Sequence, residues 1–344
     1  MATISQPIVI GDRLDTAADS AEKETQTRLA EVHAAQHEVF SAIARTHAEL
    51  LSLVAQQGAL NEAIGAARQT LAVVDTRIRA RAAPESELLR PRIEIARMES
   101  EMAHIQSLLR SAEHRLGLLV GLDRVQSASL ADQLAMNPAE LDQDALASSL
   151  IATHPRLTVL RQSADAAQAR VALAASSRTP DIVFQLGAGY DDEDSEGVLE
   201  IGAQAEIQLW DKREAPILTA RFEVLRIRQE AVDMERMLLA DLHESFSQYD
   251  SARLQLRILH DQIIPDAQNA YQQIEASYTA GRTPYIEVLD AQRTLLEARR
   301  SAAMLAGSAA VARSAIAGLA GLDAFAHATR SLPVPTPNPM EAIP

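Results

Sequence analysis

The chain contains one sequence unit twice. Residues 84–123 and 284–323 align at a constant offset of 200, and residues 8–12 match 207–211 at an offset of 199. Shared positions are Pro84/Pro284, Glu87/Glu287, Leu89/Leu289 and Gly121-Leu122-Asp123/Gly321-Leu322-Asp323. A repeat of this length is far longer than the roughly 20–50 residues of a solenoid unit. The duplication therefore predicts two copies of one large supersecondary unit, related by a pseudo-two-fold axis.

Composition favours long helices with narrow contact seams over a thick globular core. Hydrophobic residues make up 47% of the chain but aromatic residues only 3%, and Ala and Leu dominate the apolar share. The absence of Cys excludes a disulfide framework, a thiolate metal site and a Cys nucleophile. The net charge of -15 argues against nucleic acid as a partner and is compatible with a path for cations.

Targeting signals are absent from the sequence as it stands. No run of about 18 apolar residues is present, so no transmembrane helix is predicted. Residues 1–5 also lack the basic and apolar regions of a signal peptide. Taken alone, these features predict a cytoplasmic protein.

Two segments of equal length predict very long helices. The segment 12–79 has no Pro, and its apolar residues recur at steps of 3, 4 and 7. At ~1.5 Å per residue, such a helix spans roughly 100 Å. The second copy, 211–280, carries Pro265 where the first copy has Gly65. Because both residues weaken a helix, we expect both helices to be kinked or interrupted at these positions.

Each long helix is expected to turn back on itself. The turns carry Pro84 and Pro284, and Pro suits the start of a following helix. Return helices over 84–120 and 284–320 complete two long antiparallel hairpins. A further helix is expected over 154–178, after a connector that contains at most one short helix.

The segment 181–210 has a different periodicity. Apolar residues alternate with polar residues or Gly over 183–190 and again over 199–209, which predicts two amphipathic strands. The apolar positions of the second strand are Leu199, Ile201, Ala203, Ala205, Ile207 and Leu209. An apolar face opposite a polar one is typical of a membrane β-barrel with a polar lumen. An amphipathic hairpin on a soluble domain is the alternative, but the long helices offer no other core to cover its apolar face.

The chain resembles the TolC family of outer-membrane efflux channels and, within it, the CzcC-like heavy-metal group. Three segments carry the resemblance: Ile4-Ser5-Gln6-Pro7-Ile8 before the first long helix, His154-Pro155-Arg156-Leu157 at a helix start, and the tip segment 281–293. The tip reads Gly281-Arg282-Thr283-Pro284-Tyr285-Ile286-Glu287-Val288-Leu289-Asp290-Ala291-Gln292-Arg293. The resemblance covers about residues 4–323.

The resemblance implies a mostly helical homotrimer in the outer membrane that extends into the periplasm. The protomers share a twelve-stranded β-barrel in the lipid and build a long periplasmic α-barrel from their hairpins. Such a channel is a passive conduit for heavy-metal cations or other small toxic solutes, with no catalytic residue and no cofactor. Its expected partners are a periplasmic adaptor (membrane fusion protein) and an inner-membrane pump of the RND type.

This interpretation divides the chain into seven parts. They are a last strand of the first copy (1–11), the first hairpin (12–123), an equatorial connector (124–153), a short helix (154–180), a transmembrane β-hairpin (181–210), the second hairpin (211–323) and a Pro-rich tail expected to be disordered (324–344).

The resemblance also implies a periplasmic gate at the second hairpin tip. Glu287 and Asp290 match the constricting acids and lie at i and i+3 on one helix face. Tyr278 matches a position that helps to hold the closed state. Three copies would form rings of six carboxylates that favour cations. The alternative is that both acids merely stabilise a helix N-terminus. Tip residues expected to contact the adaptor are Arg81, Pro84, Glu87, Gly281, Arg282 and Pro284.

Other candidates are weaker. His33 and His37 lie at i and i+4, a spacing that suits a metal, but no third ligand is evident and exposed coiled-coil histidines are the simpler interpretation. Two further protein classes stay open: a periplasmic adaptor, which carries one hairpin where this chain predicts two, and a soluble structural coiled coil, which needs no amphipathic strands.

The repeat also predicts a missing front part. The second copy begins with the helix at His154, whose equivalent in the first copy would fall at 154 − 199 = −45. We therefore expect an N-terminally truncated channel whose signal peptide belongs to the missing part. If Met1 is the true start, a non-functional fragment is the expectation.

Overall fold

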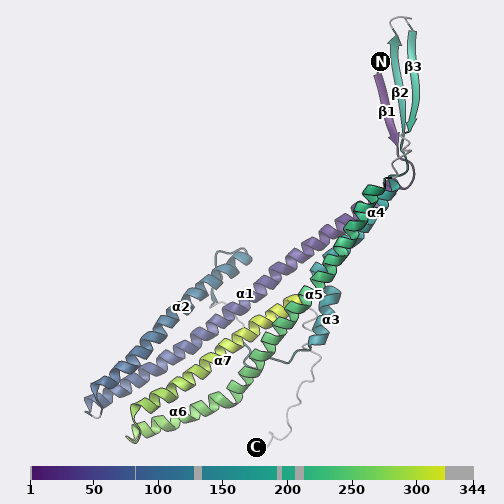
Figure 1. Cartoon of the computed structure of the whole chain (residues 1–344). Helices are drawn as coiled ribbons and strands as arrows, with labels where there is room; N and C mark the ends of the chain where they lie inside the picture. The colour runs from purple at the N-terminus through teal and green to yellow at the C-terminus, as the bar shows by residue number, and fades with distance from the viewer. Residues whose placement is uncertain (1, 82, 128–133, 192–195, 206–212, 322–344) are drawn as a thin grey trace, which may run out of the picture. The chain divides into compact units, whose positions relative to one another are not determined.

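The computed structural model describes residues 2–81, 83–127, 134–191, 196–205 and 213–321 (Figure 1). In chain order the elements are β1 (Ala2–Ile8), α1 (Arg13–Arg79), the 3-10 turn η1 (Glu85–Leu88), α2 (Leu89–Leu119), α3 (Gln143–Thr153), α4 (Pro155–Ser176), β2 (Ile182–Asp191), β3 (Glu196–Ala205), α5 (Glu214–Ile258), the π-helical turn η3 (Leu259–Ile263), α6 (Ile264–Thr279) and α7 (Tyr285–Ala320). The mostly helical fold class predicted from the sequence is confirmed.

The chain divides into two compact units. The strand unit consists of Met1–Gln36 and Thr153–Met237, and the hairpin unit consists of His37–Ala152 and Leu238–Pro344. The strand unit contains all three strands with α4 and the adjoining parts of α1 and α5. The hairpin unit contains both helical turns, α2, α3, α6 and α7.

The strands form one antiparallel sheet with the order β1-β2-β3. In its register Ile4 pairs with Leu186, which pairs with Ile201. Because side chains alternate along a strand, these three lie on one face. Ile4 is 73% exposed, Leu186 47% and Ile201 76%. The opposite face carries Gln185 and Glu200, so the sheet has one apolar face, uncovered by the described chain, and one polar face.

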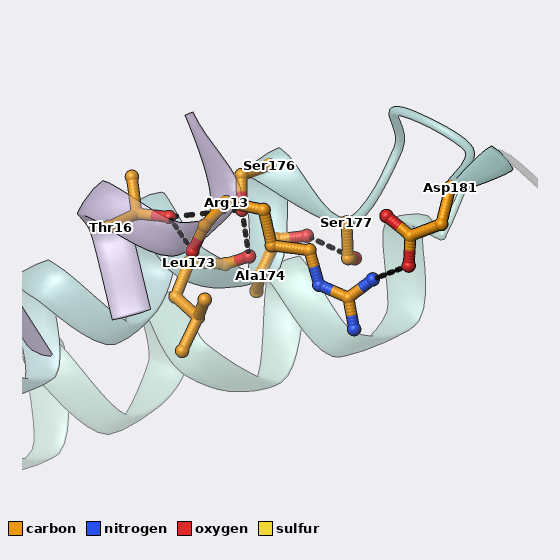
Figure 2. Close-up of polar contacts among 7 residues, drawn as sticks. All are labelled: Arg13, Thr16, Leu173, Ala174, Ser176, Ser177 and Asp181. Carbon is orange, nitrogen blue, oxygen red and sulfur yellow. Dashed lines mark hydrogen bonds and ion pairs between the residues drawn. The ribbon is translucent and has the colours of Figure 1, made fainter. Parts of the chain in front are cut away.

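A polar cluster joins the sheet to its helices (Figure 2). Arg13, the first residue of α1, forms an ion pair with Asp181, which directly precedes β2. The Thr16 hydroxyl oxygen lies 3.1 Å from the Arg13 carbonyl oxygen and 3.1 Å from Ser176 Oγ, at the end of α4. Gly11 turns the chain between β1 and α1 with a φ of 78°, which favours Gly. These contacts tie the starts of α1 and β2 to the end of α4.

The expected breaks in the two long helices occur in one copy only. Five residues at Leu259–Ile263 adopt π-helical geometry directly before Pro265. Pro lacks an amide hydrogen and its ring clashes with the carbonyl four residues earlier, here Asp261, so the helix widens at this point. The first copy contradicts the prediction, because α1 continues through Gly65 without interruption. Gly costs a helix only about 1 kcal/mol, which tertiary packing overcomes.

Two kinds of contact hold the hairpin unit together. The α1–α2 contact is apolar, through Leu60, Ala63, Ile64, Ala67, Ile95, Met98, Met102 and Ile105. The α1–α7 contact is apolar near the tip, where Val74 packs with Val288 and Leu289, and farther from the tip it involves small residues. A Cβ on Gly307 would lie 1.8 Å from Ser52 Oγ, and one on Gly318 would lie 2.9 Å from Ser41 Oγ. The two contacts are 11 residues, about three turns, apart on both helices and run in opposite directions along the chain, so α1 and α7 lie antiparallel.

Helix α7 is the core helix of this unit. Among the described helices it is the one long and apolar enough to cross a membrane by composition, over a window that is 44% buried. Its Ala302, Ala306 and Ala309 are each 1% exposed. Ala302 and Ala306 pack with Leu256 of α5, so the Ala-rich composition that gives this apolar character also permits close packing of α7.

Candidate functional site

The turns of the two hairpins have the same backbone geometry. Gly281 has a φ of 71°, and Arg81, at the equivalent position, has a φ of 56°. The Gly281 amide donates to the Tyr278 carbonyl and the Arg282 amide to the Ser277 carbonyl, both at 2.9 Å. These two bonds form a Schellman motif, which satisfies the last carbonyls of α6. The first hairpin reaches the same conformation without Gly, at a cost of about 1 kcal/mol for a left-handed residue.

The equivalence continues into the return helices. Pro84 has φ −77° and ψ 151°, and Pro284 has φ −76° and ψ 155°. Their carbonyls accept hydrogen bonds from the amides of Glu87 at 3.1 Å and Glu287 at 3.2 Å. The first return helix begins as the 3-10 turn η1, whereas α7 is α-helical from Tyr285. The two tips therefore share the backbone conformation at the common Pro and differ in the first turn of the helix that follows.

The side chains at the tips break this symmetry. Tyr278 and Tyr285, both 3% exposed, have ring centroids 5.8 Å apart at an interplanar angle of 56°. The Arg77 guanidinium carbon lies 4.0 Å from the Tyr278 ring centroid, and its Nη1 donates to the Tyr278 carbonyl at 3.2 Å. The second-copy equivalent of Arg77 is Ser277. A cation of the first hairpin thus holds an aromatic pair of the second, a contact called the Arg77 clasp below.

The clasp is set in apolar surroundings. Burial raises the pKa of Tyr278 above its ordinary value and raises the pKa of Tyr285 to about 12, and the Glu87 carboxylate acts in the same direction on both. Both phenols are therefore neutral at physiological pH. Neither hydroxyl has a hydrogen-bond partner among the residues that the structure describes. The Arg77 guanidinium acts against burial and lowers the pKa of Tyr278.

The acidic pair lies on one side of α7. Glu287 and Asp290 are exposed, and both line a shallow hollow of ≈ 240 Å³ with Ala267 and Ile274 of α6. The i, i+3 placement predicted from the sequence is therefore present in the helix. Assembly of these carboxylates into a ring stays a prediction.

The remaining predicted site residues fall into three groups. At the tips Arg81, Pro84, Gly281, Arg282 and Pro284 are exposed and Glu87 is partly buried. On the sheet Leu199 is 67% exposed, Ala203 and Ala205 are exposed, and Ile207 and Leu209 lie outside the described residues. In α1 His33 is exposed, and burial lowers the pKa of His37. The described part of the chain holds no cluster of three or more His, Asp or Glu suited to a metal ion.

Sequence reasoning missed Arg77 and Tyr285. A signal for both was present in the repeat. Arg77 replaces Ser277 directly before the position of Tyr278, and Tyr285 replaces Glu85 directly after the shared Pro. Positions where two copies differ at a shared turn are candidates for copy-specific contacts.

Comparison with known proteins gives consistent matches. Residues 146–322 match the family described as outer membrane efflux protein. The cobalt-zinc-cadmium resistance protein CzcC of Cupriavidus metallidurans is 30% identical over 212 residues, which are 60% of this chain and 50% of that protein. The chain thus spans half the length of this curated relative.

Solved structures share the fold. The outer membrane protein VceC of Vibrio cholerae aligns with a TM-score of 0.76 and 19% identity, over 93% of this chain and 78% of VceC. CusC aligns with a TM-score of 0.69 and 21% identity, over 93% of this chain and 76% of CusC. At these identities the likeness concerns the fold.

Proposed function

Because the chain belongs to the outer membrane efflux protein family, we propose that it is the channel subunit of a heavy-metal export system. In this role three copies form a passive conduit across the outer membrane, and the exposed hairpin tips dock with a periplasmic adaptor that connects to an inner-membrane pump. The 30% identity to a cobalt-zinc-cadmium resistance protein supports divalent metal cations as the exported class.

The main structural support for this proposal is the three-stranded sheet. Its apolar face exposes Ile4, Leu186 and Ile201, and a lipid bilayer covers such a face at no cost. The edges of β1 and β3 leave backbone groups that need partners in lipid, where only closed barrels satisfy them. Joining of several copies, edge to edge, closes the barrel.

Extraction and conductance test the proposal. The protein is expected to stay with the outer membrane after salt washing, to require detergent for release, and to migrate as a trimer. In planar bilayers it should conduct, and in a host lacking its own channel it should restore tolerance to cobalt, zinc or cadmium when the matching adaptor and pump are supplied. A water-soluble monomer from washed cells would contradict the proposal.

Removal of the acidic pair is expected to widen and neutralise the constriction. Glu287→Ala with Asp290→Ala should raise single-channel conductance several-fold and reduce the preference for cations, because the carboxylates focus a negative field at the axis. Reversal potentials under a salt gradient measure the preference. The control is Glu85→Ala with Glu87→Ala, which removes the same charge from the first tip. Equal selectivity in both variants would contradict the assignment of Glu287 and Asp290 to the periplasmic gate.

Loss of the Arg77 clasp is expected to favour the open state. Arg77→Ala removes a cation–π contact of about 1 kcal/mol and a hydrogen bond to the Tyr278 carbonyl, so the open fraction should rise about fivefold or more. Arg79→Ala is the control, because Arg79 pairs with Asp75 of its own helix at 2.6 Å. Single-channel recordings give the open fraction, and an equal response in the two variants would count against the clasp.

A further inference from the structure

The polar face of the sheet carries an isolated acid. Thr3, Gly187 and Glu200 form one row across β1, β2 and β3, and Gln185 pairs with Gly202 in a neighbouring row of the same face. Among the strand residues of this face whose side chains the structure describes, Glu200 is the charged one. It is exposed, and it has no hydrogen-bond or ion-pair partner among the described residues.

The Glu200 side chain lies along the wall of the sheet. A Cβ on Gly187 would lie 3.5 Å from Glu200 Cβ, 3.8 Å from Glu200 Oε2 and 3.6 Å from Thr3 Oγ1. Gly187 is buried although it belongs to a largely exposed face, because these two neighbours cover it. Gly inside a strand often marks a place where another group comes close to the backbone. The carboxylate therefore rests over Gly187, close to the sheet.

The strand sequences offer no positive charge that would offset this acid. Segments 2–8 and 182–211 contain no Lys, Arg or His, whereas Asp or Glu occurs in the second of them at positions 191–194, 196, 200, 206 and 211. The opposite face of β3 is apolar, because Leu199 and Ile201 flank Glu200 and point away from it. A low-dielectric wall focuses the field of a charge into the adjoining water. The field of Glu200 is therefore directed to the polar side of the sheet.

Glu200 lies near the middle of its strand pair. Its partner Gly187 is five residues from the first residue of β2 and four residues from the last. At about 3.4 Å per residue, these separations are roughly 17 Å and 14 Å. Glu200 belongs to the strand unit, whereas Glu287 and Asp290 belong to the hairpin unit. The acid of the sheet is therefore a feature separate from the acidic pair of α7.

We propose that Glu200 is a selectivity-determining residue of the conduit, which acts in the barrel and separately from the acidic pair of α7. The assignment rests on the proposed channel function, in which the polar face of the sheet lines the lumen. Rings of acidic side chains favour cations in channels, and lumen residues of membrane barrels tune selectivity. One Glu200 from each copy attracts hydrated cations, divalent ones most strongly, and repels anions. Because the carboxylate rests on the wall, it does so without narrowing the passage.

Removal of this carboxylate tests the assignment in planar bilayers. Glu200→Gln keeps the shape of the side chain and should lower the cation-to-anion permeability ratio about twofold at about 0.1 M salt. Reversal potentials under a salt gradient measure this ratio. The Debye length falls from about 10 Å at 0.1 M to about 3 Å at 1 M, so the difference from the unmodified chain should disappear at the higher salt. Single-channel conductance at high salt should stay unchanged, which a narrowed or distorted barrel would not show.

Chemical restoration of the charge separates its effect from any effect on the fold. The chain has no Cys, so Glu200→Cys provides a single thiol. A negatively charged methanethiosulfonate should restore the cation preference, and a positively charged one should lower it further. The control is Leu199→Cys, the neighbouring position on the apolar face, which should keep the preference and react with neither water-soluble reagent. Gln185→Glu adds a carboxylate to the polar face and should raise the permeability ratio.

Two results distinguish failure of this assignment from failure of the channel function. A conducting channel with the same permeability ratio in Glu200→Gln as in the unmodified chain, and with no response of Glu200→Cys to either reagent, would overturn the assignment and leave the channel function intact. An unmodified chain that does not conduct would contradict the channel function, and the assignment of Glu200 with it.

Discussion

Replacement of Ile201 by Arg is expected to prevent stable insertion of the sheet into the outer membrane. Ile201 is 76% exposed and lies in the row that it forms with Leu186 and Ile4 across the sheet. Arg on the lipid face of a membrane barrel costs about 2–4 kcal/mol near the bilayer centre, and a trimer incurs this cost three times. We expect the trimer band of unheated samples to disappear and the membrane-bound amount to fall at least tenfold.

The control places the same charge on the opposite face. Gln185 pairs with Gly202 and is exposed on the polar face of the same sheet. Gln185→Arg should therefore assemble like the unmodified chain, because this face lines the proposed lumen. Assembly of both variants would show that the apolar face does not contact lipid. If neither variant assembled, the sheet would tolerate no added charge on either face. The proposed difference between a lipid-facing and a lumen-facing side would then be unsupported.

Backbone features were the part of this protein that the sequence predicted well. Period-two alternation over 183–190 and 199–205 identified strands, because successive side chains of a strand point to opposite faces. Helices do not show this pattern. The helix ends followed from local chemistry, since Pro284 opens α7 and Gly281 adopts the left-handed conformation after α6. Local rules of this kind need no knowledge of the partner segment.

The contacts between the hairpins were not predictable in the same way. Arg77 meets Tyr278 across 201 residues, and Arg293 meets Glu94 across 199. A Glu or Arg every three or four residues is also what any solvated helix face shows, so the charged residues of α2 and α7 give no distinct signal in one copy. Comparison of the two copies helps, because charges of opposite sign at Arg97 and Glu297 appear only when the repeat is aligned.

Gly65 and Gly307 show why a residue type alone does not predict its effect. Both lie inside long helices, where Gly costs about 1 kcal/mol relative to Ala. A Cβ on Gly65 meets nothing within 4 Å, whereas one on Gly307 meets Ser52. Helix propensity therefore opposes both glycines, but packing requires only the second.

Gly307→Leu is expected to destabilise the hairpin unit by about 3 kcal/mol or more. Its Cβ would lie 1.8 Å from Ser52 Oγ, 2.5 Å from Ser52 Cβ and 3.1 Å from Ser52 Cα. Rotation of the Ser52 side chain relieves only the first contact, so the two helices must move apart. That movement opens the α1–α7 contact over several turns. Thermal unfolding of the helices, followed by circular dichroism in detergent, should show a lower midpoint.

Two companion variants separate packing from helix propensity. Gly65→Ala should raise the free energy of unfolding by about 1 kcal/mol, because the added methyl meets no neighbour and Ala favours the helix. Exchange of the contacting residues, Ser52→Gly with Gly307→Ser, keeps one small and one larger residue at the crossing and should recover most of the stability lost in Gly307→Leu. If Gly307→Leu unfolded at the same midpoint as the unmodified chain, α1 and α7 would not be in close contact at Gly307.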